Sequence, residues 1–333
     1  MPSSAPAAPP RQPIWIGLLI LYVVWGSTYL GIAIAIETIP PFVMAAIRFV
    51  IAGLVLVGWS MAREGRSFTA PSRREWRDSA IVGALLLGGG MGMVSFGEQT
   101  VPSGITALLI ALMPVWVAIL GRVFLGERLP RLAVIGIVAG FGGVAILIGP
   151  SAFGGSGALD GLGLAAIMCS PISWASGSLF ASHRAQLPRL PLLATGVEML
   201  CGGLVLAAMS VVSGELGDFH PGSISPASLG ALAYLTIVGS LVAFTAFGWL
   251  LRVAPLALIA TYAYVNPIVA VALGAALHGE AIDPRTLVAG AVIVLAVALI
   301  VTARGRMQGP RSAVVSEPDP EPGGASAVPV PTR

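Results

Sequence analysis

Lysine is absent from this 333-residue sequence, and other charged and metal-binding residues are scarce. Only 10% of the residues are charged, all 18 basic residues are arginine, and there are two cysteines and three histidines. The sequence contains no Walker A, HExxH or GxSxG motif and no Cys/His metal spacing, and Gly88-Gly89-Gly90 lies inside an apolar run where no phosphate loop forms. These absences argue against ATP hydrolysis and against a metal or cofactor site in this chain.

Apolar residues dominate what remains. Hydrophobic residues make up 56% of the chain and the mean hydropathy is +0.91, which predicts an all-α membrane protein. A spanning helix needs about 20 apolar residues. Ten stretches meet this need: 14–35, 41–62, 79–98, 102–121 and 131–149, then 160–182, 190–213, 227–251, 255–277 and 285–303.

The distribution of charge predicts the topology. Arginines recur in alternate loops and not in one basic patch, which argues against nucleic acid as a partner despite the net charge of +3. The positive-inside rule then places both termini in the cytoplasm. Arg285 is the only basic residue of the opposite loops. Those loops carry Glu37, Glu98, Asp160, Glu215, Asp218, Glu280 and Asp283.

The two halves of the chain repeat one another. An offset of 153 positions pairs Pro102 with Pro255, Pro114 with Pro267, Gly126 with Gly279 and Glu127 with Glu280. A second, slightly shifted offset of 149 to 150 positions places Trp25 on Trp174 and the Gly53–Leu56 run on Gly203–Leu206. Each half holds five spans, so the second half enters the membrane from the other side, as in carriers built from inverted repeats.

These patterns divide the chain into five segments. We expect repeats at 14–149 and 160–303, a linker at 150–159 and disordered tails at 1–13 and 304–333. The first span is long enough to be retained and not cleaved as a signal peptide. Glu127 and Glu280 follow helix ends and are expected to serve as turn or cap residues.

Three ionisable residues lie deep in the predicted spans, where a charge costs roughly 2.5 to 3.5 kcal/mol. Arg48 and Glu198 occupy matching places in the second and seventh spans. They are candidates for a gating or coupling ion pair or for a site that binds a zwitterion. The structural alternatives are a static ion pair or an arginine bonded to helix-end carbonyls. Glu98 ends the third span, where it can take up a proton for coupling or form a solvated helix end.

Aromatic and hydroxyl residues mark the first and sixth spans at corresponding places. They are Trp25, Ser27 and Tyr29 in the first and Trp174 and Ser176 in the sixth. We expect these residues to bind substrate at the repeat interface, although tryptophans also serve as interfacial anchors.

Prolines in the middle of two spans predict a second group of site residues. Pro114 and Pro267 each remove a helical hydrogen bond, and paired helix breaks are a good indicator of a carrier site. The candidate substrate-binding residues beside these predicted helix breaks are Met113, Tyr262, Tyr264 and Asn266.

These segments together resemble the drug/metabolite transporter superfamily, and within it the ten-helix EamA-domain permeases of the amino-acid and metabolite exporter branch. The resemblance rests on Trp25-Gly26-Ser27, Gly97-Glu98-Gln99, Leu112-Met113-Pro114, Asn266-Pro267 and Gly279-Glu280. It implies two inverted five-helix repeats around a central cavity lined mainly by helices 1, 3, 4, 6, 8 and 9, with alternating access.

We therefore expect a secondary transporter that exports a small metabolite, an amino acid or an amphipathic compound, across a bacterial inner membrane as a monomer or homodimer. Membrane lipids and the substrate are the expected partners, and the proton is the candidate coupling ion. Uptake and facilitated diffusion remain alternatives. A membrane-embedded lipid-modifying enzyme is a further class, but the sequence shows no cluster of acid, base or nucleophilic groups at one depth.

Overall fold

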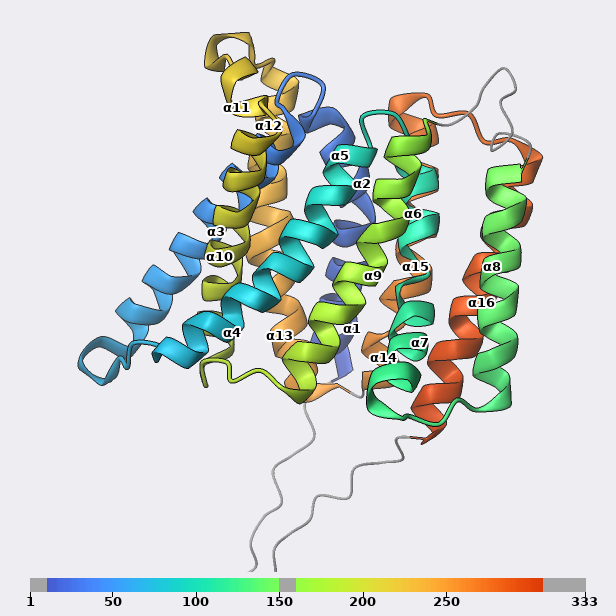
Figure 1. Ribbon diagram of the computed structural model, residues 1–333, viewed down its shortest axis with the longest axis horizontal. Coiled ribbons are helices and arrows are strands. Elements are labelled where there is room, and N and C mark those ends of the chain that lie inside the picture. The colour runs from blue at the N-terminus through green and yellow to red at the C-terminus, as the bar shows by residue number, and fades with distance from the viewer. Residues whose placement is uncertain (1–10, 150–159, 255, 308–333) are drawn as a thin grey trace, which may run out of the picture.

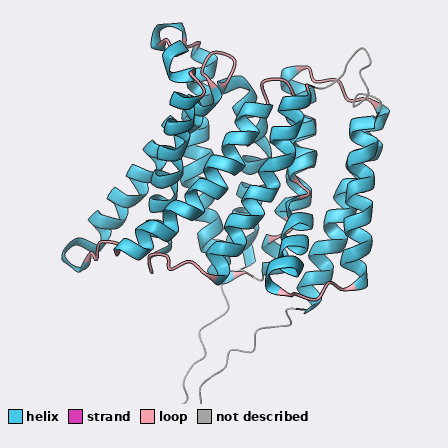
Figure 2. Ribbon diagram, in the orientation of Figure 1, coloured by secondary structure: helices cyan, strands magenta, loops and turns pink. Residues whose placement is uncertain are grey.

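The described part of the chain is helical throughout and contains no strand (Figure 2). The structure is a computed structural model that describes residues 11–149, 160–254 and 256–307. The predicted linker, most of the predicted tails and Pro255 lie outside these residues.

The first half of the chain forms five membrane spans. Their helices are α1 (Arg11–Ile20), η1 (Leu21–Trp25) and α2 (Gly26–Ala35) in span 1; α3 (Pro41–Glu64) and η2 (Gly65–Ser67) in span 2; α4 (Arg73–Gly83), η3 (Ala84–Gly92) and α5 (Met93–Gly97) in span 3; α6 (Ser103–Ile110) and α7 (Met113–Leu125) in span 4; and α8 (Arg131–Ile148) in span 5.

The second half forms five more. They are α9 (Gly161–His183) in span 6; α10 (Pro191–Val212) in span 7; α12 (Pro226–Tyr234), η6 (Leu235–Val242) and α13 (Ala243–Val253) in span 8; α14 (Leu256–Ile259) and α15 (Tyr262–His278) in span 9; and α16 (Pro284–Met307) in span 10. The short helices α11 (Glu215–Asp218) and η5 (Pro221–Ser223) connect spans 7 and 8. Among the described residues, nine of these spans are long and apolar enough to cross a membrane. The remaining one is span 9, which is divided between α14 and α15.

Corresponding helices of the two repeats pack against each other. Helix α3 lies along α10, and α8 lies along α16 (Figure 1). The first span of each repeat packs on the third and fourth spans of the other, α2 on α12 and α15, and α9 on η3, α5 and α7. Helix α1 begins and α16 ends on the same side of the bundle, which we call the terminal face; the other side is the opposite face (Figure 1).

Small residues allow α8 and α16 to approach closely. A methyl group added at Gly136 would lie 2.8 Å from the carbonyl oxygen of Ala296, and one at Gly143 would lie 3.3 Å from that of Ala289. The offset of 153 positions pairs Gly136 with Ala289 and Gly143 with Ala296, so each residue contacts the mate of the other. Such small-residue contacts are the usual basis of tight helix packing in lipid.

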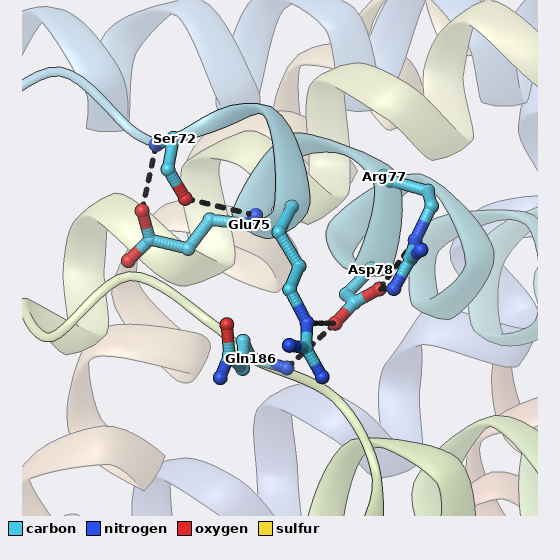
Figure 3. A network of polar contacts seen from close by, with 6 residues as sticks. Ser72, Glu75, Arg77, Asp78 and Gln186 are labelled. Atoms are coloured by element: carbon cyan, nitrogen blue, oxygen red, sulfur yellow. Dashed lines mark hydrogen bonds and ion pairs between the residues drawn. The ribbon is translucent and has the colours of Figure 1, made fainter.

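Span 3 begins earlier than the hydropathy predicts, at Arg73 and not at residue 79. A capping box starts α4, because the Ser72 hydroxyl accepts from the Glu75 amide while the Glu75 carboxylate accepts from the Ser72 amide (Figure 3). One turn later, buried Asp78 accepts from the Arg77 guanidinium at 2.8 Å and from the Gln186 amide at 2.8 Å. This network ties span 3 to the connection between spans 6 and 7.

Spans 4 and 9 are both broken, but only the break in span 4 lies at its predicted proline. Helix α6 ends at Ile110 and α7 begins at Met113, with Pro114 in its first turn. Pro267 instead lies buried inside α15, and the break falls at residues 260–261, before Tyr262. The prediction of a break at Pro267 was wrong, because a proline removes one hydrogen bond, which a helix held by its neighbours tolerates.

Arg285, the basic residue that departs from the charge rule, has a structural role. Its guanidinium donates to the carbonyl of Ile146 at 2.7 Å, to that of Ile148 at 2.6 Å, and to that of Leu147. These are carbonyl groups that the C-terminus of α8 leaves without a helical partner. A cation there also matches the negative end of the helix dipole.

We expect Arg285→Gln to lower the free energy of unfolding by about 1 to 2 kcal/mol, since glutamine cannot reach the three carbonyls and a hydrogen bond to a charged group contributes about that much. Thermal unfolding in detergent measures the loss. Arg131→Gln, at the exposed start of α8, is the control and should unfold as the wild type does. Equal melting temperatures for the two variants would contradict this role.

Candidate functional site

Four aromatic rings meet where spans 1, 8 and 9 come together. The Trp25 ring centroid lies 5.4 Å from that of Phe244, 5.2 Å from that of Phe247 and 5.0 Å from that of Tyr262. Edge-to-face and tilted arrangements of this kind are favourable between aromatic rings. Trp25 closes η1, a π-helical turn, and such turns are frequent at functional sites.

Hydroxyl groups lie on both sides of this cluster. The Ser27 hydroxyl lies 2.6 Å from the Tyr234 hydroxyl of α12. The Tyr22 hydroxyl bonds to the Thr261 hydroxyl at the break in span 9. Spans 1, 8 and 9 are thus joined by polar contacts.

Phe244 connects Trp174 with its repeat mate Trp25. Phe244 contacts the Trp25 ring and also lines a small pocket with Trp174, Glu198 and Thr195. Apolar side chains of α4, η3 and α10 complete the lining: Val82, Leu86, Leu87 and Met199. The pocket therefore takes residues from both repeats.

Arg48 and Glu198 do not meet. The buried Arg48 donates from Nε to the Ser240 hydroxyl at 2.9 Å, and its guanidinium lies 4.7 Å from the centroid of the Phe49 ring. Glu198 faces the pocket described above. Among the described residues, the ion pairs join Asp78 to Arg74 and Arg77. The alternative of a static pair between Arg48 and Glu198 was therefore wrong.

Glu98 is 7% exposed, and both of its carboxylate oxygens lack a hydrogen-bond partner in the described part of the chain. It interacts electrostatically with Glu280 and with Tyr29, which in turn interacts with Tyr262. The expectation of a solvated helix end was wrong, because the neighbouring spans cover this position. Asn266 is also buried, and its side-chain oxygen has no hydrogen-bond partner among the residues that the structure describes.

Two of the predicted site residues, Ser176 and Met113, lie away from the aromatic cluster, whereas Tyr264 reaches the polar contacts beside it. The Ser176 hydroxyl donates to the Ile172 carbonyl of its own helix at 2.8 Å. Tyr264 packs against the apolar core between spans 4, 5 and 10 and also interacts with Thr261 and Tyr22 at the break in span 9. Met113 begins α7 and is half-buried, with no described contact to the aromatic cluster.

Two carboxylates outside the spans act as helix caps on the opposite face. Burial raises the pKa of Glu215, although the amides of Phe42 and Val43 donate to it at the start of α3. The Thr286 amide at the start of α16 donates to Asp283 and lowers its pKa.

Sequence reasoning missed Phe244, Tyr234 and Ser240, and it missed the π-helical segments η1, η3 and η6. Segments η3 and η6 occupy corresponding places in the two repeats. Comparison of the third and eighth spans could have suggested a shared distortion, because Gly88–Gly90 has Gly239-Ser240 near its repeat-related place.

A polytopic bundle of two five-helix repeats, with aromatic and polar groups at the meeting of both repeats, defines the class of membrane transport proteins. The chain belongs to the EamA-like transporter family, whose profile matches residues 13–149 and again 161–302. The match to both halves confirms the predicted duplication.

Named relatives agree with this assignment. The uncharacterized inner membrane transporter YedA of Escherichia coli is 38% identical, over 86% of this chain and 90% of its own. The protein PecM of Dickeya dadantii is 28% identical, over 84% of this chain and 88% of its own. One solved crystal structure superposes with a TM-score of 0.60 at 20% identity, covering 89% of this chain and 99% of that one, which supports the fold.

Proposed function

We propose that this protein is a secondary transporter that exports a small, partly apolar compound, such as an amino acid or an amphipathic molecule, by alternating access. The ring cluster of Trp25, Tyr262, Phe244 and Phe247 carries this proposal. It lies where three spans from both repeats meet, which is the position expected of a carrier site. Uptake by the same route is the alternative.

The membrane and the orientation are part of the proposal. YedA is called an inner membrane transporter, and we assign this chain to the same membrane of a bacterium. The loops of the terminal face are rich in arginine, whereas those of the opposite face are acidic. The positive-inside rule then makes the terminal face cytoplasmic and the opposite face external.

The charges of the interior favour a substrate without a phosphate group. Arg48 is a deeply buried arginine, and its guanidinium is bonded to Ser240. A phosphorylated substrate would require several free basic groups. The Glu98 carboxylate, buried without a hydrogen-bond partner, is the candidate carrier of a coupling proton.

Counterflow in proteoliposomes with labelled amino acids and cationic amphipathic compounds tests the site. We expect saturable exchange of one class of compound and a loss of about tenfold or more in Trp25→Ala, because a ring in contact with a ligand contributes roughly 1 kcal/mol or more beyond its buried area. Trp15→Ala is the matched control, since Trp15 lies in the same span and is 58% exposed. Equal exchange by both variants would overturn the proposed site.

A further inference from the structure

A single carboxylate joins spans 4 and 9 on the opposite face. Glu280 follows the end of α15, and its Oε1 accepts from the Ser103 amide at 2.8 Å and from the Ser103 hydroxyl at 2.6 Å. Its Oε2 accepts from the Gly104 amide at 2.9 Å. These amides begin α6, so the carboxylate also meets the positive end of that helix. We call this contact the outer clasp.

The terminal face carries a matching glutamate, Glu127, at the repeat-related position. Glu127 and Glu280 each follow a glycine with positive φ that ends a helix. Their amides donate to the carbonyls of Gly121 and Gly274, at 3.2 Å and 3.1 Å. Each carboxylate folds back over the same glycine, where an added methyl group would lie 2.7 Å from Glu127 and 2.5 Å from Glu280. The two glutamates therefore leave their helices in the same way.

Within the described residues, a buried carboxylate, that of Glu98, interacts with the outer clasp. Glu98 interacts electrostatically with Glu280 and has no hydrogen-bond partner among the described residues. Two carboxylates that are both charged repel strongly away from water. The positions related to Glu98 by the repeat offsets are Phe247, Gly248 and Leu251, which do not ionise.

The other groups around Glu98 do not neutralise it. Tyr29 of α2 interacts with Glu98 but carries no positive charge. Among the elements packed against α5, η3 has no ionisable residue, and α9 is preceded by Asp160, which is exposed. Arg48 of α3 is bonded to Ser240. The proton on Glu98 is therefore the simplest means of removing the repulsion.

We propose that Glu280 and Glu127 are paired clasps, each closing one face by tying spans 4 and 9 together, and that a proton on Glu98 controls the outer clasp alone. This proposal rests on the alternating access proposed above. When Glu98 holds its proton, Glu280 stays on α6 and the external face is closed. When the proton leaves Glu98 toward the cytoplasm, the two carboxylates repel each other and the clasp opens, which lets Glu98 take up the next proton from external water.

The inner clasp is assigned by the repeat. The offset of 153 positions pairs Ser103 and Gly104 with Leu256 and Ala257, at the start of α14. The amides of these two residues are the counterparts that Glu127 would bind. Leucine has no hydroxyl, so the inner clasp has one donor fewer and no proton control. The cytoplasmic face would then open without regard to external pH.

Distances between spin labels on the opposite face test the outer clasp. The labels are placed at Gln99→Cys and His278→Cys, both exposed positions, in a Cys169→Ala, Cys201→Ala background reconstituted in nanodiscs. Raising the pH from about 6 to about 8 should increase the ratio of long to short distances, by up to about tenfold per pH unit for one coupled proton. Glu98→Gln should stay short at both pH values, and Glu280→Gln should be long at both.

Two further variants are controls, and a third replaces Glu280→Gln if that variant does not fold. Glu37→Gln changes an exposed carboxylate on the same face and should respond to pH as the unsubstituted pair does, as should Glu127→Gln. If Glu280→Gln does not fold, Ser103→Ala removes one donor and should raise the ratio about fivefold. A pH response that persists in Glu98→Gln, or a wild-type ratio in Glu280→Gln or Ser103→Ala, would overturn the proposal. The measurement needs no substrate, so a failed transport assay with this response intact would count against the proposed function alone.

Discussion

Replacing Gly53 with leucine is expected to prevent recovery of folded protein. A methyl group at this position would lie 2.7 Å from the backbone nitrogen of Leu200 and 2.8 Å from the carbonyl oxygen of Gly196, at the crossing of α3 and α10. Overpacking a core costs about 1 to 3 kcal/mol when side chains can move aside. Here backbone meets backbone, so the helices themselves must separate and the loss exceeds that range. Size-exclusion chromatography of a fluorescent fusion measures the folded fraction.

The same helix supplies the control. Gly58 has open space where a side chain would go, so Gly58→Leu should give a monodisperse peak like that of the wild type. Gly203, the repeat mate of Gly53, would bring an added methyl group within 2.9 Å of the Val50 amide nitrogen. Gly203→Leu should therefore fail as Gly53→Leu does. Recovery of folded Gly53→Leu with an unchanged melting temperature would show that this crossing is not fixed by close approach.

This crossing also shows what the sequence can predict. The Gly53–Leu56 and Gly203–Leu206 runs were aligned from residue identity alone, and the structure brings both glycines to the contact between α3 and α10. Glycine occurs at both positions because a close approach of two backbones leaves no room for a larger residue. Gly126 and Gly279 are a second case, with φ of +69° and +68°, since a left-handed helix end favours glycine.

The candidate site was harder to predict, because its residues come together only through packing between the repeats. Phe244 and Ser240 have no distinctive neighbours in the sequence, yet one contacts Trp25 and the other holds Arg48. The symmetry of Arg48 and Glu198 suggested a pair, but inverted repeats place corresponding residues in opposite halves of the membrane. Symmetry-related positions thus predict similar surroundings and not mutual contact.

Glu98→Gln is expected to abolish accumulation driven by a pH gradient, while substrate exchange at equal pH continues more slowly because the outer clasp then opens less often and without regard to pH. Glutamine is close in size to glutamate and cannot exchange a proton, so the variant keeps the packing around α5 and loses only the titrating group. A gradient of one pH unit can drive about tenfold accumulation for each coupled proton, because one pH unit corresponds to 1.36 kcal/mol. Flux in proteoliposomes with and without an imposed gradient separates the two components.

Glu37→Gln is the matched control for this measurement, since Glu37 lies on the same face and is exposed. It should keep the full response to the gradient. If both variants accumulate substrate to the same level with a gradient, Glu98 is not the proton carrier. If Glu98→Gln also loses exchange at equal pH, the carboxylate is needed for substrate translocation itself. Burial of both oxygens without a hydrogen-bond partner favours the first of these roles, because a charged carboxylate in that position would be left without compensation whereas a protonated one is neutral.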